Sequence, residues 1–447
     1  MSRRSVVTTA GLAAGASALP LACTREKQKV SIHKRPWWVR GVDRPTLGEV
    51  NQDFGRFGGR NIFALHRELK EGREGKEAVR LQQQQKRERV AKWIREGKAG
   101  FGLRDRALDD AAWTVMRAGA ARANLLSWTH LRVRTPEEMG VEKYAASPEQ
   151  AANTVKAAAR LYGAALVGIA PMNEKYVNLA ERDRPIVFED VEAPQRTDEK
   201  LVIPKRMKWV VALAVQMNHD LIMRSPTAVG EGAASLGYSH CAFVVATLAE
   251  FIRGLGYEAI PSVNDTAQSV PFAVDAGLGE LSRLNRLITP EFGPAVRLCK
   301  VFTDLPMACD KPIDFGVVEF CKRCKKCAEA CPSRALSFDD EPSFKVRGPW
   351  NNPGHKAWFE DSYKCFEYWQ EVTTGCNICF ASCPYTKAAE ASIHDMVKAA
   401  ASVAPVADPV FRVMDDAFGY GRQHDPEEWW RKNKPAFGVD SRRGTEG

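Results

Sequence analysis

The sequence predicts an α+β core followed by a compact cysteine-rich segment. Short apolar runs typical of strands alternate with longer runs typical of helices between residues 105 and 314. Eight of the 12 cysteines then lie between Cys321 and Cys383 at short intervals. The first pattern sets the fold class, and the second sets the chemistry.

Helix caps and apolar runs define the elements of the core. Pro148 and Glu149 are typical of a helix start, and Gly163 is typical of a helix end. The elements expected in the core are, in order, a helix over 148–162, strands over 164–170 and 209–216, a helix over 241–253 and a strand over 257–261.

Composition changes along the chain divide it into five segments. The arm is expected to be irregular up to residue 75, with an exposed charged helix over 76–98 that ends at Gly97. The segments are a targeting segment (1–23), an N-terminal arm and helix (24–104), the α+β core (105–314), the cysteine segment (315–390) and a C-terminal tail that packs on the core (391–447).

The first residues are similar to a twin-arginine export signal. Arg3 and Arg4 precede a weakly apolar stretch, and Ala16-Ser17-Ala18 offers a cleavage site. Cleavage after Ala18 and lipidation at Cys23 both stay open, as does a chance arginine pair before an Ala-rich helix. The formal net charge of +9 is spread along the chain without a nucleic-acid-binding signature, so we expect no nucleic-acid partner.

The cysteine segment contains a doubled motif. The first run is Cys321-x2-Cys324-x2-Cys327-x3-Cys331-Pro332, and the second is Cys365-x10-Cys376-x2-Cys379-x3-Cys383-Pro384. This pattern is typical of two [4Fe-4S] clusters in a ferredoxin-like segment, in which the fourth cysteine of each run binds the other cluster. Cluster one is therefore assigned to Cys321, Cys324, Cys327 and Cys383, and cluster two to Cys331, Cys365, Cys376 and Cys379. Two zinc sites are the alternative.

Three scattered cysteines, Cys241, Cys299 and Cys309, are expected to be small buried thiols. No G-x-G-x-x-G or Walker motif occurs, so nothing indicates a dinucleotide or ATP. The redox centre that the clusters serve is therefore expected in the 105–314 core.

Several motifs together resemble a reductive dehalogenase catalytic subunit. They are the twin arginine, Val301-Phe302-Thr303-Asp304-Leu305-Pro306, Asp310-Lys311-Pro312-Ile313 and Phe315-Gly316 before the first cysteine run. The resemblance implies a nitroreductase-like core that binds a corrinoid and reduces carbon–halogen bonds. It also implies that Tyr238 donates a proton, that Arg297 lies beside it, and that Asn264 belongs to the same site.

These roles fit the chemistry of the side chains. A tyrosine hydroxyl carries its proton at neutral pH, and a nearby arginine stabilises the anion left behind. Tyr238 as a packed tyrosine, Arg297 as a surface ion pair and Asn264 as a turn residue are the plainer readings.

No histidine follows an aspartate by two residues, which favours a base-off corrinoid without a protein ligand and with cobalt free to reach Co(I). Trp350, Trp358 and Trp369 either line an apolar substrate pocket or pack in the core.

The predicted function is an exported enzyme that replaces the halogen of an organohalide by hydrogen. The resemblance implies a small membrane-anchor protein, electrons from the quinone pool, organohalide respiration and a peripheral place on the periplasmic side, and it leaves a homodimer open. The alternatives are an epoxyqueuosine reductase-like corrinoid enzyme and a non-catalytic exported electron carrier.

Overall fold

The structure is a computed structural model that describes residues 35–58, 62–119, 125–129, 133–181, 183–386, 413, 417, 419 and 421–431. The predicted targeting segment, with Arg3, Arg4, Ala18 and Cys23, lies outside the described residues. The chain divides into two units, Met1–Ile32 and His33–Gly447, and the described residues all belong to the second.

The core contains a four-stranded antiparallel sheet in the order β2-β7-β11-β8. Its strands are β2 (Leu166–Pro171), β7 (Trp209–Gln216), β11 (Val296–Thr303) and β8 (Ala259–Ser262). The two central strands pair along their whole length, from Gln216 opposite Val296 to Trp209 opposite Thr303. The predicted strands β2, β7 and β8 are confirmed to within two residues at each end, and β11 was not among the predictions.

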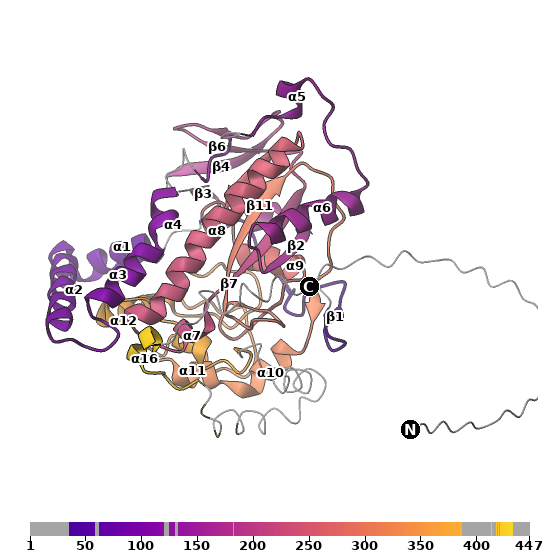
Figure 1. Cartoon of the computed structure of the whole chain (residues 1–447). Helices are drawn as coiled ribbons and strands as arrows, with labels where there is room; N and C mark the ends of the chain where they lie inside the picture. The colour runs from indigo at the N-terminus through magenta and orange to yellow at the C-terminus, as the bar shows by residue number, and fades with distance from the viewer. Residues whose placement is uncertain are drawn as a thin grey trace, which may run out of the picture. The chain divides into compact units, whose positions relative to one another are not determined.

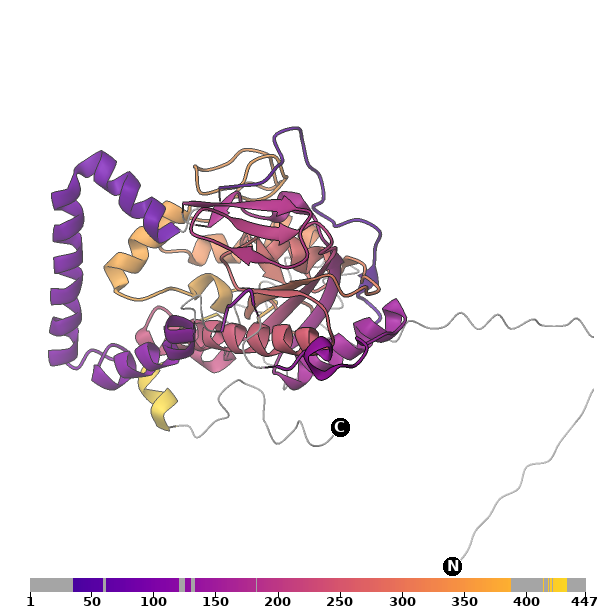
Figure 2. The same ribbon diagram turned by 90° about the horizontal axis from the view of Figure 1, so that it is seen from above.

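Both faces of this sheet are covered, because successive side chains of a strand point to opposite sides. Val211, Leu213 and Val215 pack with the helices α6 (Pro148–Leu161) and α8 (Ala228–Gly254). The alternate residues of β7 pack toward α9 (Ser269–Asp275) and a second sheet. Figure 2 shows α8 along one side of the central sheet and the second sheet on the other side. Burial on both faces explains the uninterrupted apolar run of β7.

Helix α8 begins at Ala228, 13 residues before the predicted start at Cys241. The hydroxyl of Thr227 caps it by accepting a hydrogen bond from the backbone N–H of Gly230 at 3.1 Å. The first half of the helix is rich in glycine, which disfavours helices, so the sequence alone did not indicate that it is helical. Its packing on α3 (Leu103–Ala112), visible in Figure 1, compensates for that low propensity.

By length and composition, α8 is apolar enough to cross a membrane, with a mean hydropathy of 1.3 over its most apolar 18 residues. However, 61% of that window is buried inside the protein. A buried core helix meets the same criteria, and α8 lies against the central sheet (Figure 1), so the helix is weak support for a membrane span.

The second sheet has the order β3-β4-β6-β5, in which β4 and β6 run parallel. Its strands are β3 (Ala180–Glu181), β4 (Arg184–Glu189), β6 (Leu201–Pro204) and β5 (Gln195–Arg196). Two of these strands have only two residues each, too few to give a sequence signal.

The N-terminal arm is more helical than predicted. Residues 35–58 are irregular apart from two residues in β1, but 62–74 form α1 because leucine and other helix formers dominate them. The charged helix is confirmed as α2 (Lys76–Arg95), with Gly97 in a left-handed conformation beyond its end. Remaining elements are β1 (Arg40–Gly41), α1 (Ile62–Glu74), α4 (Thr114–Gly119), α5 (Pro136–Met139), η1 (Glu174–Tyr176), α7 (His219–Ile222), β9 (Glu280–Leu281), β10 (Leu287–Ile288) and β12 (Ile313–Asp314).

The cysteine segment consists of short helices joined by irregular loops: α10 (Val317–Cys324), α11 (Lys326–Ala330), α12 (Ser362–Val372) and α13 (Ile378–Ala381). The described part of the tail forms α16 (Pro426–Arg431). Trp430 donates a hydrogen bond from Nε1 to the buried carboxylate of Asp105 at 2.7 Å, so this part of the tail packs against α3.

Candidate functional site

The first group of thiols comes from the helices that open and close the cysteine segment. Cys321 and Cys324 lie one turn apart on α10, which ends where Lys325 takes a left-handed conformation, and Cys327 follows on α11. Cys383 follows α13. All four side chains are buried.

Burial, opposed by Arg283 and reinforced by the nearby Cys324, raises the pKa of Cys321 to about 12. Burial likewise raises the pKa of Cys327, with further contributions from Cys321, Cys383 and Cys324 and a smaller one from Cys379 of the second group. The four cysteines assigned to cluster one therefore lie in one electrostatic neighbourhood. Closely spaced, buried thiols of this kind favour binding to a positively charged metal centre, which stabilises them as thiolates.

The second group contains Cys331, Cys365, Cys376 and Cys379, all half-buried. Burial, reinforced by Cys365 and Cys331, raises the pKa of Cys376 to about 12. Cys379 is raised by burial and then by Cys376 and Cys331. The grouping matches the assignment to cluster two and includes Cys365, which the ten-residue insertion separates from Cys376 in sequence.

Each thiol group has its own arginine. The fully buried Arg283 donates to the carbonyl of Cys321 from Nε at 2.9 Å and from Nη2 at 2.6 Å. Arg286 lies near Cys365 and Cys379, where its charge lowers both of their pKa values against the larger effect of burial. A salt bridge of 2.7 Å to Glu360 holds Arg286 in place. Arg286 is therefore the fixed cation beside the second group, as Arg283 is beside the first.

Within the described residues, no three His, Cys, Asp or Glu side chains are placed around one point as ligands of a single metal ion. The thiolates around a cube bind different irons, so they lie farther apart than the four ligands of one zinc ion.

The three residues named for the proton donor come together from three elements. Tyr238 lies on α8, Asn264 follows β8, and Arg297 lies on β11. Asn264 Nδ2 donates a hydrogen bond to the Tyr238 hydroxyl at 3.1 Å, and the Arg297 guanidinium lies 4.9 Å from the centre of the Tyr238 ring. Trp113 also stacks on this ring, at 5.4 Å. Of the plainer readings, the surface ion pair is the one that the geometry disfavours, because Arg297 is half-buried and faces the ring.

A glycine makes this approach possible. A Cβ atom at Gly237 would lie 2.9 Å from Cγ of Arg297, so a larger residue would push the arginine off Tyr238. Glycine costs a helix interior about 1 kcal/mol relative to alanine. The close passage of Arg297 across α8 accounts for a glycine directly before Tyr238.

Arg297 connects the tyrosine to the loop that carries cluster two. Its Nη2 donates to Oδ1 of Asn377 at 3.4 Å, and Asn377 is the residue after Cys376. The amide nitrogen of Asn377 faces the carboxyl of Glu231 without an aligned hydrogen bond. A continuous polar path therefore leads from the second group of thiols to Tyr238.

Two carboxyl groups, those of Glu231 and Asp109, lie close to this path. Desolvation, and then repulsion from Asp109, raises the pKa of Glu231 to about 8, against the opposing effects of Arg297 and Asn377. Burial raises the pKa of Asp109 as well, although Ser235 donates a hydrogen bond to its carboxylate. At neutral pH Glu231 therefore keeps its proton, about two turns before Tyr238 on α8.

Two buried hydrogen-bonding atoms near Tyr238 have no aligned hydrogen bond. They are Nε of Arg297 and Nδ2 of Asn377, which faces the Glu231 carboxyl. Unsatisfied donors and acceptors in a buried site indicate a missing polar ligand. A corrinoid, whose rim carries amide groups that both donate and accept hydrogen bonds, fits this set.

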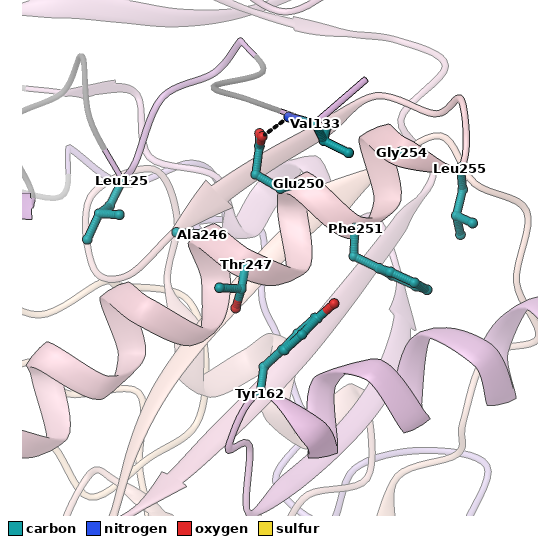
Figure 3. Close-up of a pocket in the computed structure, with 9 residues that line it drawn as sticks. All are labelled: Leu125, Val133, Tyr162, Ala246, Thr247, Glu250, Phe251, Gly254 and Leu255. Atoms are coloured by element: carbon teal, nitrogen blue, oxygen red, sulfur yellow. Dashed lines mark hydrogen bonds between the residues drawn. The ribbon is translucent and has the colours of Figure 1, made fainter. Parts of the chain in front are cut away.

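A separate apolar pocket of about 500 Å³ lies between α8 and the end of α6 (Figure 3). Its lining residues are Leu125, Val133, Tyr162, Ala246, Thr247, Glu250, Phe251, Gly254 and Leu255. In Figure 3 the Tyr162 ring faces the side of α8 that carries Thr247 and Phe251, and Glu250 accepts a hydrogen bond from the Val133 backbone at 3.1 Å. The pocket contains none of Tyr238, Asn264 and Arg297.

The tryptophans around cluster two differ in role. Trp358 is fully buried and donates to the Asp339 carbonyl at 3.0 Å, as a core residue does. Trp350 donates to the Glu360 carbonyl at 3.2 Å. Core packing therefore accounts for Trp358. Cys241 and Cys299 are buried as predicted, but Cys309 is only half-buried, because it lies in the loop after β11.

Sequence reasoning missed Asn377, Glu231 and Trp113. Asn377 lies within the second cysteine run, in which only the cysteines were considered as functional residues. Glu231 is the single charged residue in the first half of α8, seven positions before Tyr238 and hence on the same helix face. A charge in an otherwise small and apolar run was the available signal.

Comparison with known proteins gives matches over most of the chain. A family model described as "Reductive dehalogenase subunit" matches residues 181–307, and one described as "4Fe-4S double cluster binding domain" matches residues 320–386. The tetrachloroethene reductive dehalogenase of Sulfurospirillum multivorans is 37% identical over 382 residues, which cover 78% of this chain and 74% of that protein.

A solved catabolic reductive dehalogenase has the same fold, with a TM-score of 0.66 at 23% identity, over 88% of this chain and 50% of that one. The chain thus spans half the length of this solved relative. The double-cluster model confirms two [4Fe-4S] clusters over two zinc sites, and the α+β core followed by a double-cluster segment is confirmed.

The epoxyqueuosine reductase alternative matches less well. That enzyme of Listeria monocytogenes serovar 1/2a is 27% identical over 179 residues, which cover 39% of this chain. The dehalogenase of Sulfurospirillum multivorans covers twice that share at higher identity. With its double-cluster segment and a curated relative that is 37% identical and matched over most of its length, the chain belongs to the reductive dehalogenase family.

Proposed function

We propose that the chain replaces the halogen of an organohalide by hydrogen. The proposal depends on the surroundings of Tyr238. Its hydroxyl accepts a hydrogen bond from Asn264, and its ring lies next to the Arg297 guanidinium. Arg297 in turn bonds to Asn377, in the loop that carries Cys376. The reaction consumes two electrons and one proton and releases halide, so it needs both an electron path and a proton donor.

The cysteines and the polar atoms divide these tasks. Cluster one would be held by Cys321, Cys324, Cys327 and Cys383, and cluster two by Cys331, Cys365, Cys376 and Cys379. Arg297 and Asn377 would bind the rim of the corrinoid through their buried nitrogen atoms that have no aligned hydrogen bond. When bound, the clusters supply single electrons and the corrinoid supplies the low-valent cobalt that breaks the carbon–halogen bond.

Tyr238 supplies the proton in this proposal. Its hydroxyl is oriented by Asn264, which donates and so leaves the phenolic proton free to point elsewhere. Arg297 stabilises the tyrosinate that remains after transfer. Asn264 orients the donor, Arg297 stabilises its anion, and Asn377 holds Arg297 in place.

We further propose a base-off corrinoid, because no histidine of the sequence has an aspartate two residues before it. Export by the twin-arginine route, a small membrane anchor, electrons from the quinone pool and a homodimer on the periplasmic side complete the proposal. Arg3 and Arg4 support it, since clusters must be inserted before a folded chain is exported. Chlorinated ethenes are the first substrates to test, because relatives bear these substrates in their names.

Purification of the chain with its cofactors tests the proposal. We expect about eight iron, eight sulfide and one corrinoid per chain, and halide release from tetrachloroethene with a low-potential one-electron donor. Clusters without corrinoid and without halide release would identify an electron carrier. Corrinoid without halide release from any of a panel of chlorinated and brominated compounds would refute the substrate class.

A further inference from the structure

A charged residue lies in the middle of the central sheet. Lys300 is on β11 between Cys299 and Val301, and its side chain is 0% exposed. Burying an ammonium group is costly unless hydrogen bonds compensate for the lost water. A lysine in this place therefore needs specific acceptors, and the structure provides them.

The acceptors belong to the loop that follows β8. Lys300 Nζ donates to the carbonyl oxygen of Val263 at 2.8 Å and to Oγ of Ser269 at 3.0 Å. The Ser269 hydroxyl also donates to the Val263 carbonyl, at 3.1 Å. Two donors thus converge on one carbonyl, which belongs to the peptide group joining Val263 to Asn264.

The same loop is fixed from its other side. Asp265 Oδ1 accepts from the backbone N–H of Val263 and from Oγ of Ser262, both at 3.0 Å. Asn178 donates to the Asp265 carbonyl at 3.0 Å. Asn264, the exposed residue between these anchors, donates to the Tyr238 hydroxyl. The direction of its side chain is therefore set by backbone groups that Lys300 and Asp265 hold.

The groups around Lys300 keep it charged at neutral pH. Burial lowers the pKa of Lys300 to about 8, while Asp265 from the loop, Cys299 from β11 and Cys241 from α8 oppose the shift. A charged donor makes stronger hydrogen bonds than a neutral one.

We propose that Lys300 is a positioning residue for the proton donor: its ammonium fixes the Val263–Asn264 peptide so that the Asn264 amide stays bonded to Tyr238. The proposal rests on the proposed role of Tyr238. It differs from a purely structural role, in which Lys300 would satisfy a buried carbonyl without affecting the contact between Asn264 and Tyr238.

The test uses Lys300→Met, which keeps the length of the side chain and removes the donor. Lys156→Met is the matched control, because Lys156 is also buried and pairs with Asp310 at 2.6 Å, away from the Val263 loop. Both changes are made in the wild-type chain and in Asn264→Ala, so that a double-mutant cycle isolates the route through Asn264.

We expect Lys300→Met to lower kcat about tenfold, as loss of one oriented hydrogen bond does, with KM changed less than about twofold. In the Asn264→Ala background the same change should cost less than about twofold, because the contact that it disturbs is already absent. Equal losses in both backgrounds, or a loss confined to KM, would overturn the proposal.

A second readout needs no turnover. Incorporation of 3-fluorotyrosine at position 238 gives one fluorine resonance in corrinoid-free protein with oxidised clusters. Lys300→Met should move this resonance toward its value in Asn264→Ala, and Lys156→Met should leave it in place. An unmoved resonance in Lys300→Met would refute the proposal even if the chain proved to have no dehalogenase activity, which would separately refute the proposed function.

Should Lys300→Met fail to fold, Ser269→Ala removes one acceptor of the ammonium and one donor to the Val263 carbonyl. The proposal then expects a smaller shift of the resonance in the same direction. No shift in a folded Ser269→Ala would contradict it.

Discussion

Removal of Arg297 is expected to slow turnover by about two orders of magnitude. The guanidinium lies 4.9 Å from the centre of the Tyr238 ring. At that separation and an effective dielectric constant of about 20, a unit charge stabilises the tyrosinate by about 3 kcal/mol, or roughly 10²-fold in rate. Arg297→Ala should therefore lower kcat by about this factor. Arg297→Lys should lose less, since it keeps the charge but not the planar fork that reaches Asn377.

The assay is halide release under saturating substrate, with iron, sulfide and corrinoid content measured on the same samples. Arg206→Ala is the control, because it also removes one positive charge, from a residue that pairs with Glu192 and Asp304 and not with the Tyr238 group. If Arg297→Ala retains near wild-type kcat with full cofactor content, the arginine does not stabilise the anion. Equal losses in the lysine and alanine variants would contradict a role for its charge.

Three further outcomes follow from the structure. Arg286→Gln should make cluster two harder to reduce by tens of millivolts, because a cation near Cys365 and Cys379 is lost, while cluster one keeps its potential in an EPR-monitored redox titration. The native state releases the Lys300 proton near pH 8, before the unfolded chain does near pH 10.5, so stability should rise across this window. Melting temperatures should show a shallower rise in Lys300→Met, and parallel curves would refute the burial argument. Changing Arg3 and Arg4 to Lys should retain the precursor inside the cell, and mature protein in the periplasm would exclude the twin-arginine route.

The sequence predicted the elements whose signals are local. Helix α6 has a proline start and a glycine end, and β7 is an uninterrupted apolar run, so both were found with nearly correct bounds. The first half of α8 was missed because its stability comes from packing on α3, which residue preferences do not contain. The two-residue strands of the second sheet carried no signal because they are too short to show an alternating pattern.

The candidate site was predictable only in part. The cysteine spacing fixed both thiol groups, including the exchange of Cys331 and Cys383 between them. Tyr238, Asn264 and Arg297 were named from a resemblance, since nothing in their spacing shows that three elements meet there. Asn377, Glu231 and Lys300 became visible only when the fold placed them beside that group, although each polar side chain among apolar or cysteine neighbours was an available sign.

The most direct test of the central claim is the rate of halide release by Tyr238→Phe with intact cofactors. The change removes one hydroxyl, so both clusters and the corrinoid should assemble and be reduced as in the wild type. Loss of a positioned general acid costs about 10²–10⁴-fold, and we expect kcat to fall by that amount. Tyr257→Phe, which removes a hydroxyl that donates to the Tyr144 carbonyl at 2.8 Å, should stay near the wild-type rate. Near-full activity of Tyr238→Phe with complete cofactors would show that another group donates the proton.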